Sequence, residues 1–301
     1  MNRFENITKP LMWSTTLLLA AIVAGCGGSG DGVPGAGPGP GAGGGGAGVV
    51  GAVCTGASCV NLGTAANYVI LDEATVTFTP TATTTTTPTI TGNIGVSPAA
   101  ASSLTGFALA LDPAKCFSTS TRVTGKIYAA DYSSVNGCAT ATSDTATILT
   151  TAVGDKNTAY TAAAGMATAG GGLPVGSPNE CPGAGAFGGR TIVPGVYKCA
   201  VSVGIATATN LVLNGTATDV WVFEITGMLS QAGSTQVQLT GGALPQNIFW
   251  ATFAAASLDT TSKFKGVILS QTSIAMKTGA TINGRLLAGT QVTLDQNTVG
   301  P

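Results

Sequence analysis

A short threonine-containing unit recurs along the chain, and this repeat most constrains the fold. The unit is a Thr, two mostly small residues and a second polar residue, followed in most copies by an apolar residue. The last four copies begin at positions 207, 232, 260 and 278, so the intervals are 25, 28 and 18 residues. Such intervals suit the coils of a β-solenoid, where each coil carries about three short strands and buries its apolar side chains by stacking on its neighbours.

The apolar residue that follows the repeat unit is expected to point into the solenoid. In this architecture each strand pairs with the strands of the coils above and below it, about 4.8 Å away. One apolar side chain per strand then fills the interior. The residues in this position are Ile90, Val123, Leu211, Phe264 and Ile282.

Other segments of the chain read as short strands and one helix. Residues 144–166 have apolar residues at near-helical spacing, which predicts a helix of about 20 residues with Asp144 near its start. Trp221 and Trp250 occupy the centres of expected strands, which favours a core position and leaves sugar stacking as an alternative. β-branched and aromatic runs predict strands at 68–71, 220–225, 237–239, 248–250 and 266–269.

The composition argues against several classes of function. Only 8% of the residues are charged, with 12 basic against 13 acidic side chains, whereas an ordinary globular chain carries about 25%. This balance provides no basic surface for nucleic acid. The chain has no His, which removes Ser–His and Cys–His catalysis and the commonest metal ligand. Asp72-Glu73 is interpreted as a lone, solvated acidic pair. We expect no enzyme, no metal and no cofactor.

The N-terminal segment has the pattern of an export signal. A charged start is followed by a short apolar run and by Val23-Ala24-Gly25-Cys26, which resembles a bacterial lipobox. We therefore expect a lipoprotein signal peptide over 1–25, lipidation of Cys26 and anchoring to a bacterial cell envelope, at the outer membrane. Secretion by an ordinary signal peptide is the alternative. Residues 26–59 are rich in Gly and Pro, which predicts a flexible tether, and 60–301 form one domain.

The cysteines that remain after Cys26 form an even set, which in an exported chain indicates disulfides. Zinc is the competing interpretation, but structural zinc sites use closely spaced Cys pairs or Cys with His, and one close pair is present. The spacing favours three local bridges: Cys54–Cys59, Cys116–Cys138 and Cys181–Cys199.

Several blocks of the sequence resemble the bacterial and fungal ice-binding domain known as DUF3494. The resemblance covers residues 60–301 in order and implies an irregular right-handed parallel β-helix, mainly β, with one long α-helix packed along its side. The blocks that carry it include Val60-Asn61-Leu62-Gly63, Val123-Thr124-Gly125-Lys126, Pro194-Gly195-Val196-Tyr197, Asp219-Val220-Trp221-Val222, Asn247-Ile248-Phe249-Trp250 and Gly284-Arg285-Leu286-Leu287.

The resemblance also implies an ice-binding pattern of Thr, Ala or Gly, any residue, then Thr or Asn, on one flat face. Two copies match this pattern in full, at 207–210 and 278–281, and the others depart from it. Thr suits such a face because β-branching restricts its χ1, its methyl is apolar and its hydroxyl can hold water. The candidate ice-binding residues are Thr207, Asn210, Thr235, Thr260, Thr278, Thr281, Thr86, Thr89 and Thr119.

The resemblance therefore implies an ice-binding protein that adsorbs to ice crystals and gives thermal hysteresis and recrystallisation inhibition. The alternative is an adhesive or structural β-solenoid at the cell surface that binds another polymer. A polysaccharide-active enzyme should show clustered carboxylates, and the sequence has no such cluster. The expected partners are the ice surface and, through the N-terminal lipid alone, a membrane; the expected state is a monomer.

Overall fold

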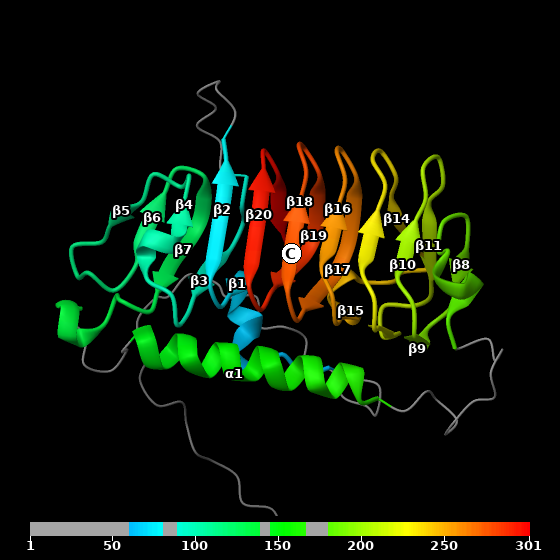
Figure 1. Cartoon of the computed structure of the whole chain (residues 1–301), viewed down its shortest axis with the longest axis horizontal. Helices are drawn as coiled ribbons and strands as arrows, with labels where there is room; N and C mark the ends of the chain where they lie inside the picture. The colour runs from blue at the N-terminus through cyan, green and yellow to red at the C-terminus, as the bar shows by residue number, and fades with distance from the viewer. Residues whose placement is uncertain (1–59, 81–88, 139–144, 167–179) are drawn as a thin grey trace, which may run out of the picture. The chain divides into compact units, whose positions relative to one another are not determined.

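The structure is a computed structural model that describes residues 60–80, 89–138, 145–166 and 180–301. Most of these residues wind into a parallel β-solenoid with three sheets, named here A, B and C, and one long helix beside it (Figure 1). The signal peptide, Cys26, the tether, the Cys54–Cys59 bridge, Thr86 and Asp144 lie outside the described residues. Within the described ranges, no helix combines the length and apolarity that crossing a bilayer requires.

Sheet A is the largest sheet and runs the length of the solenoid. Its strands follow the order β5-β6-β7-β3-β1-β19-β17-β15-β12-β9, and β21 also pairs with β19. The pairs are parallel except for β5–β6 and β6–β7. The bounds are β1 Tyr68–Asp72, β3 Asn93–Val96, β5 Ala110–Leu111, β6 Ser118–Ser120, β7 Val123–Ala129, β9 Gly195–Cys199, β12 Trp221–Ile225, β15 Ile248–Thr252, β17 Lys263–Ser270, β19 Thr281–Leu287 and β21 Thr298–Gly300.

Sheets B and C form the other sides of the coils. Sheet B is parallel throughout and has the order β10-β13-β16-β18-β20-β2-β4, and sheet C has the order β14-β11-β8. The bounds in sheet B are β2 Thr75–Thr79, β4 Leu104–Thr105, β10 Val203–Ile205, β13 Leu229–Gln231, β16 Ala256–Leu258, β18 Ser273–Met276 and β20 Gln291–Asp295. Those in sheet C are β8 Thr191–Ile192, β11 Leu211–Asn214 and β14 Val237–Thr240.

The coils do not stack in sequence order. In sheet A, β1 lies between β3 and β19, and in sheet B, β2 lies between β4 and β20. The last coil of the chain therefore pairs directly with the first, and the C-terminus lies in the middle of the solenoid (Figure 1). The irregular repeat intervals have a different cause. The copies at 207, 232, 260 and 278 lie in consecutive coils that stack in order, and the segment between 260 and 278 is the shortest because it has no sheet-C strand.

Helix α1, Thr145–Ala164, covers the outer side of sheet A, as predicted from residues 144–166. It runs across the strands (Figure 1) and contacts β7, β12, β15 and β17. Its buried residues include Leu149, Ala152, Ala159 and Ala163, which pack with the outward apolar residues of sheet A. Short 3-10 helices complete the described secondary structure: η1 Gly63–Asn67, η2 Ala101–Ser103, η3 Ser134–Asn136, η4 Pro182–Gly185 and η5 Pro245–Asn247.

The interior of the solenoid is filled by one continuous apolar core. The five apolar residues that follow the repeat unit were predicted to point inward, and all five are buried, at 5% exposure or less. Trp221 and Trp250 are fully buried, and the Trp250 ring stacks on Phe223 with centroids 4.1 Å apart. Their burial rules out the alternative of exposed sugar-stacking platforms.

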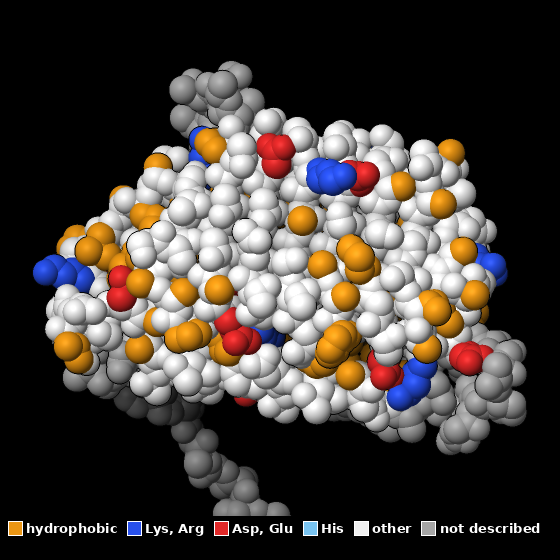
Figure 2. Space-filling view, viewed as in Figure 1, with side chains coloured by type: hydrophobic (Ala, Val, Ile, Leu, Met, Phe, Trp, Pro, Cys, Tyr) orange, Lys and Arg blue, Asp and Glu red, His pale blue; other side chains and the backbone are white. Residues whose placement is uncertain are grey.

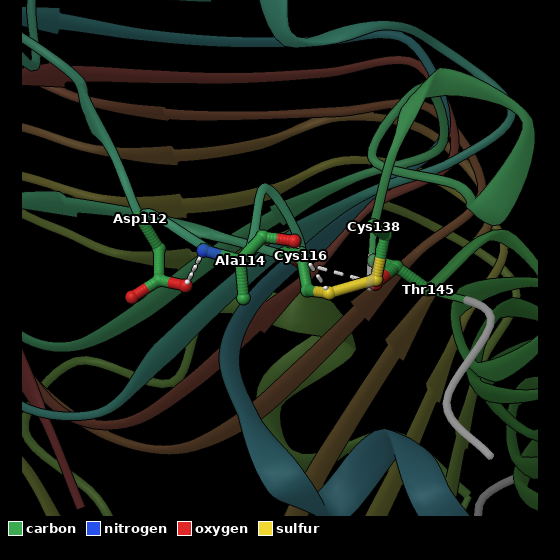
Figure 3. The surroundings of a disulfide bond; sticks show 5 residues. All are labelled: Asp112, Ala114, Cys116, Cys138 and Thr145. Carbon is green, nitrogen blue, oxygen red and sulfur yellow. Dashed lines mark hydrogen bonds between the residues drawn. A yellow bond between two sulfur atoms is a disulfide. The ribbon is translucent and has the colours of Figure 1, made fainter. Parts of the chain in front are cut away.

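Two disulfides lie within the described residues, and both were predicted from spacing. Cys181 pairs with Cys199 at the end of β9, and Cys116 pairs with Cys138. Figure 3 shows the second bridge beside the first residue of α1, Thr145, whose hydroxyl donates to the Cys116 carbonyl over 3.0 Å. Asp112 accepts a hydrogen bond from the Ala114 amide in the same turn. The bridge and the Thr145 bond together fix the start of α1 against the solenoid.

The prediction that Asp72-Glu73 is a solvated pair is wrong. Asp72 is fully buried at the end of β1, where one carboxylate oxygen accepts the amides of Ala74 and Thr75. Burial raises the pKa of Asp72 to about 6, although these backbone hydrogen bonds lower it. Glu73 forms an ion pair of 2.6 Å with the buried Lys156 of α1. The sequence could not show that α1 returns to this corner 83 residues later.

Candidate functional site

The outer side of sheet B is an open face in the described part of the molecule, and no helix covers it (Figure 1). Its strands alternate between inward apolar and outward small or polar residues. In β2, Val76 and Phe78 are buried, and the threonines that alternate with them face outward. Because every pair of neighbouring strands is parallel and in register, the outward residues form straight rows across the sheet.

Two of these rows are uncharged throughout the described strands. The central row follows directly from the strand register and has Thr at one end and smaller residues at the other. Its members, from β4 to β10, are Thr105, Thr77, Thr293, Ala275, Ser257, Ser230 and Gly204. The neighbouring row, two residues earlier on each strand, includes Thr75, Gln291, Ser273, Ala255 and Met228.

The shape of the face follows from these side chains. At the Thr end, the hydroxyl of Thr105 donates to that of Thr77 over 3.2 Å, which holds both side chains in place. At the other end, Gly204, Ala206 and Ala232 leave a shallow hollow of about 610 Å³ over β10, β13 and β16. Figure 2 shows this side of the molecule, where uncharged atoms cover most of the face and a few charged groups lie above and below its middle.

A third row of sheet B carries charge. It contains Asp259, Lys277 and Asp295, which follow β16 and β18 and end β20 in adjacent coils. Lys277 forms an ion pair of 2.6 Å with Asp259 and is 58% exposed. The hydrogen bond from Lys277 lowers the pKa of Asp259 below its ordinary value. The hydroxyl of Thr278 donates to Asp295.

The repeat unit marks the corner where the chain leaves sheet B. In each coil the second residue of this corner has a left-handed backbone conformation, which L side chains other than Asn and Asp adopt at a cost. The third residue points inward, and the fourth begins the next side of the coil. The residues with positive φ at these corners are Ala208, Ser234, Thr261, Gly279 and Gln296.

The structure distributes the predicted site residues over both sides of this corner. Thr207, Thr260 and Thr278 lie exposed in one row beside the charged row of sheet B. A second group begins the following side of the coils and is half-buried: Asn210, Thr281 and Thr89. In this group Asn210 accepts the Gln236 amide over 2.8 Å, and Thr281 pairs with Lys263 in sheet A.

Two predicted residues lie apart from these rows. Thr235 is 1% exposed, and its hydroxyl donates to the Ala232 carbonyl over 2.7 Å, so its assignment as a surface contact is wrong. The positive φ of Ser234 shows that the copy at 232–235 is offset by one residue, which moves Thr235 into the inward position. Thr119 is exposed on β6, in the antiparallel end of sheet A.

The outward threonines of sheet B were missed from the sequence. Thr75, Thr77 and Thr293 belong to no copy of the repeat unit, yet they lie in the two uncharged rows. The sequence signal for these residues was the alternation of polar and apolar residues in the segments 75–79, 273–276 and 291–295.

Among the described residues, no group of three or more acidic or Cys side chains is placed to hold a metal ion.

Comparison with known sequences finds ice-binding proteins that are similar to this chain. The model of the family described as "Ice-binding-like" matches residues 70–300. An ice-binding protein of Flavobacterium frigoris is 42% identical over 241 residues, which are 80% of this chain and 75% of the relative. Ice-binding protein K3-B1 of Typhula ishikariensis is 42% identical over 73% of this chain and 80% of the relative.

Solved structures show the same fold. The ice-binding protein LeIBP from an Arctic yeast superposes with a TM-score of 0.70 at 36% identity, over 82% of this chain and 95% of that protein. The DUF3494 domain of a Shewanella frigidimarina ice-binding protein superposes with a TM-score of 0.65 at 26% identity, over 80% of this chain and 96% of that domain. The fold expected from the sequence is therefore confirmed.

Proposed function

Because this chain belongs to the ice-binding-like family, we propose that it binds ice through the outer face of sheet B. It is an ice-binding protein and not an enzyme. The relatives that it matches over most of their length are ice-binding proteins. The choice of face rests on the two adjacent uncharged rows. Thr77 and Thr293 belong to the central row, and the strands that carry both rows pair in register across the sheet.

The geometry of these rows suits a crystalline partner. Ice presents a repeating array of water molecules and no charge, and parallel strands repeat about every 4.8 Å. Threonine side chains on adjacent strands offer methyl and hydroxyl groups with few rotamers to lose. The sheet beneath them is rigid because its inner side is packed into the core of the solenoid. A flat, uncharged and rigid surface can therefore meet many lattice positions at once.

The exposed corner threonines extend the same surface at its edge. Thr207, Thr260 and Thr278 project from the turns that end the sheet-B strands, so we propose that they contact ice at the margin of the face. We do not assign contacts to the row of Asn210, Thr89 and Thr281, because it begins a different side of the coils and includes Lys263.

Ice growth in the presence of purified residues 54–301 tests the function. We expect faceted crystals, a gap between melting and freezing temperatures, and inhibition of recrystallisation. A protein that leaves crystals round and the gap at zero, but retains the native far-UV spectrum, would favour the alternative of an adhesive or structural β-solenoid. A single sedimentation boundary at the monomer mass would support a monomeric state.

We also propose that the protein is exported and held at the cell envelope by a lipid on Cys26. The two disulfides are typical of proteins that fold in an oxidising compartment. Support for the lipid comes from the residues before Cys26 and the Gly- and Pro-rich segment after it, which would act as a tether for the domain of 60–301. In cell fractionation, Cys26→Ser should move the protein out of the membrane fraction, and equal membrane association of both forms would contradict the anchor.

A further inference from the structure

The charged row of sheet B lies between two uncharged surfaces. On one side are the two rows centred on Thr77 and Thr293, and on the other are the corner threonines Thr260 and Thr278. In the coils at either end of the row, the matching positions are Ala206, Ala232 and Thr79, which are uncharged. The charges therefore occupy the three central coils alone, where they interrupt an otherwise continuous uncharged surface.

The charged side chains of this row contact one another and a threonine of the adjoining corner. Asp259 and Lys277 are joined by the ion pair of 2.6 Å, and both side chains are well exposed, at 40% and 58%. Asp295 accepts the hydrogen bond of the Thr278 hydroxyl, so this hydroxyl is directed toward a carboxylate. Exposed ammonium and carboxylate groups keep their hydration shells, because an uncharged partner cannot replace those interactions.

We propose that Asp259, Lys277 and Asp295 form a charged boundary within the ice-binding face and limit its activity. They separate the two uncharged rows from the corner threonines, so that these two surfaces contact ice as separate patches. This inference rests on the proposed function and identifies the residues that set the extent of the same site. It follows that a chain with neutral residues in this row has a larger continuous face.

The test replaces the row with residues found at matching positions in other coils. In the full chain, the variant Asp259→Ala/Lys277→Thr/Asp295→Thr should raise thermal hysteresis roughly 1.5-fold, since a third row is added to two and buried contact grows with area. The melting temperature should change little, because exposed ion pairs contribute little to stability. An isosteric variant, Asp259→Asn/Lys277→Gln/Asp295→Asn, keeps the shape of the row and should show a smaller rise in the same direction.

The matched control is the ion pair between Lys198 and Glu224, which spans 2.8 Å between β9 and β12 on the side of sheet A that carries α1. Lys198→Gln/Glu224→Gln should leave hysteresis unchanged. If the wild-type chain is active and both row variants are folded but equally active or weaker, the charged row is no boundary and the inference fails. If the wild-type chain does not shape ice, the proposed function itself fails. Should the first variant not fold, the isosteric variant decides the question.

Discussion

Sheets A and B are built from the same coils, yet their strands have different burial patterns. In sheet A, all five residues of β15, Ile248–Thr252, are buried, and so are all five of β1. In sheet B, the residues of β18, Ser273–Met276, alternate between half-buried and buried. The two patterns differ because α1 covers the outer side of sheet A and nothing in the described chain covers that of sheet B.

This difference indicates the role of the outward-facing residues in each sheet. A sheet with both sides covered has nearly continuous apolar strands, whereas a sheet with one open side alternates. Solvent alone would favour Lys and Glu on the open side, because charged residues protect exposed sheets. The two uncharged rows of sheet B have Thr, Ser, Ala, Gln, Gly and Met in those places. Solubility therefore does not explain the composition of these rows, and we attribute it to ice binding.

The largest expected effect comes from a bulky ring on the open sheet. Thr293→Tyr places an aromatic ring in the centre of the uncharged rows and should lower thermal hysteresis roughly tenfold, since even a gap of about 1 Å forfeits a large part of each contact. The melting temperature should stay within about 2 °C, because the side chain points outward. Nanolitre osmometry and calorimetry measure the two quantities.

The control for this substitution lies on α1. Thr158 is exposed on the helix, and its hydroxyl bonds to the Gly154 carbonyl within the same helix. Thr158→Tyr adds the same ring on the covered side of the molecule and should leave hysteresis unchanged. A larger loss from Thr158→Tyr than from Thr293→Tyr would move the ice-binding surface to the helix side.

The second prediction concerns the cover on sheet A. Leu149 is fully buried between α1 and the sheet, so close to β3 that a Cβ added to Gly95 would lie 2.7 Å from its Cδ2. Leu149→Ala should lower the free energy of unfolding by about 2–5 kcal/mol through lost burial and a cavity. Denaturant titration measures this loss. Hysteresis per folded molecule should be retained, and a proportional loss of both would mean that α1 shapes the sheet-B face.

The third prediction concerns Asp72, at the corner between the two sheets. Its pKa is raised to about 6 in the folded state from an ordinary 3.8, so the folded protein binds a proton that the unfolded chain releases. The contribution of Asp72 to stability should therefore fall as the pH rises from about 4 to about 6, by up to about 3 kcal/mol. Unfolding titrations of Asp72→Asn should lack this part of the slope and show greater stability at pH 8. An unchanged slope would contradict the raised pKa.

The smallest effect is expected on the open side of sheet B. Ser257 faces outward from β16 beside the buried Leu258. Ser257→Ala should change the free energy of unfolding by less than about 0.5 kcal/mol. A loss as large as that of Leu149→Ala would show that the outer rows hold the sheet together, which would weaken their assignment to ice.

The elements of the fold could be predicted because their signals are local. The apolar residue after each repeat unit, the helix at Thr145–Ala164 and the two described disulfides all depend on residues within one coil or one segment. The position of β1 between β3 and β19 depends instead on strands more than 200 residues apart. No periodicity within the chain could indicate that order.

The candidate site was predicted less well, for a geometric reason. The repeat unit identifies the corners correctly, but two residues three positions apart at a corner face different sides of the solenoid, as Thr278 and Thr281 do. An offset of one residue is enough to turn a side chain inward, as happens at Thr235. Which threonines share a face is decided by strand register, which spacing alone does not contain.

The sequence by itself determined that this chain forms a solenoid, because uncharged, β-branched segments at coil-length intervals can bury their apolar residues only by stacking. The tertiary structure decided which side of the solenoid is left open. Helix α1 is held against sheet A by Leu149 and by Lys156, which reaches both Glu73 and the Ala288 carbonyl. Because these contacts join segments far apart in the sequence, the covering of sheet A, and with it the exposure of sheet B, exists only in the folded molecule.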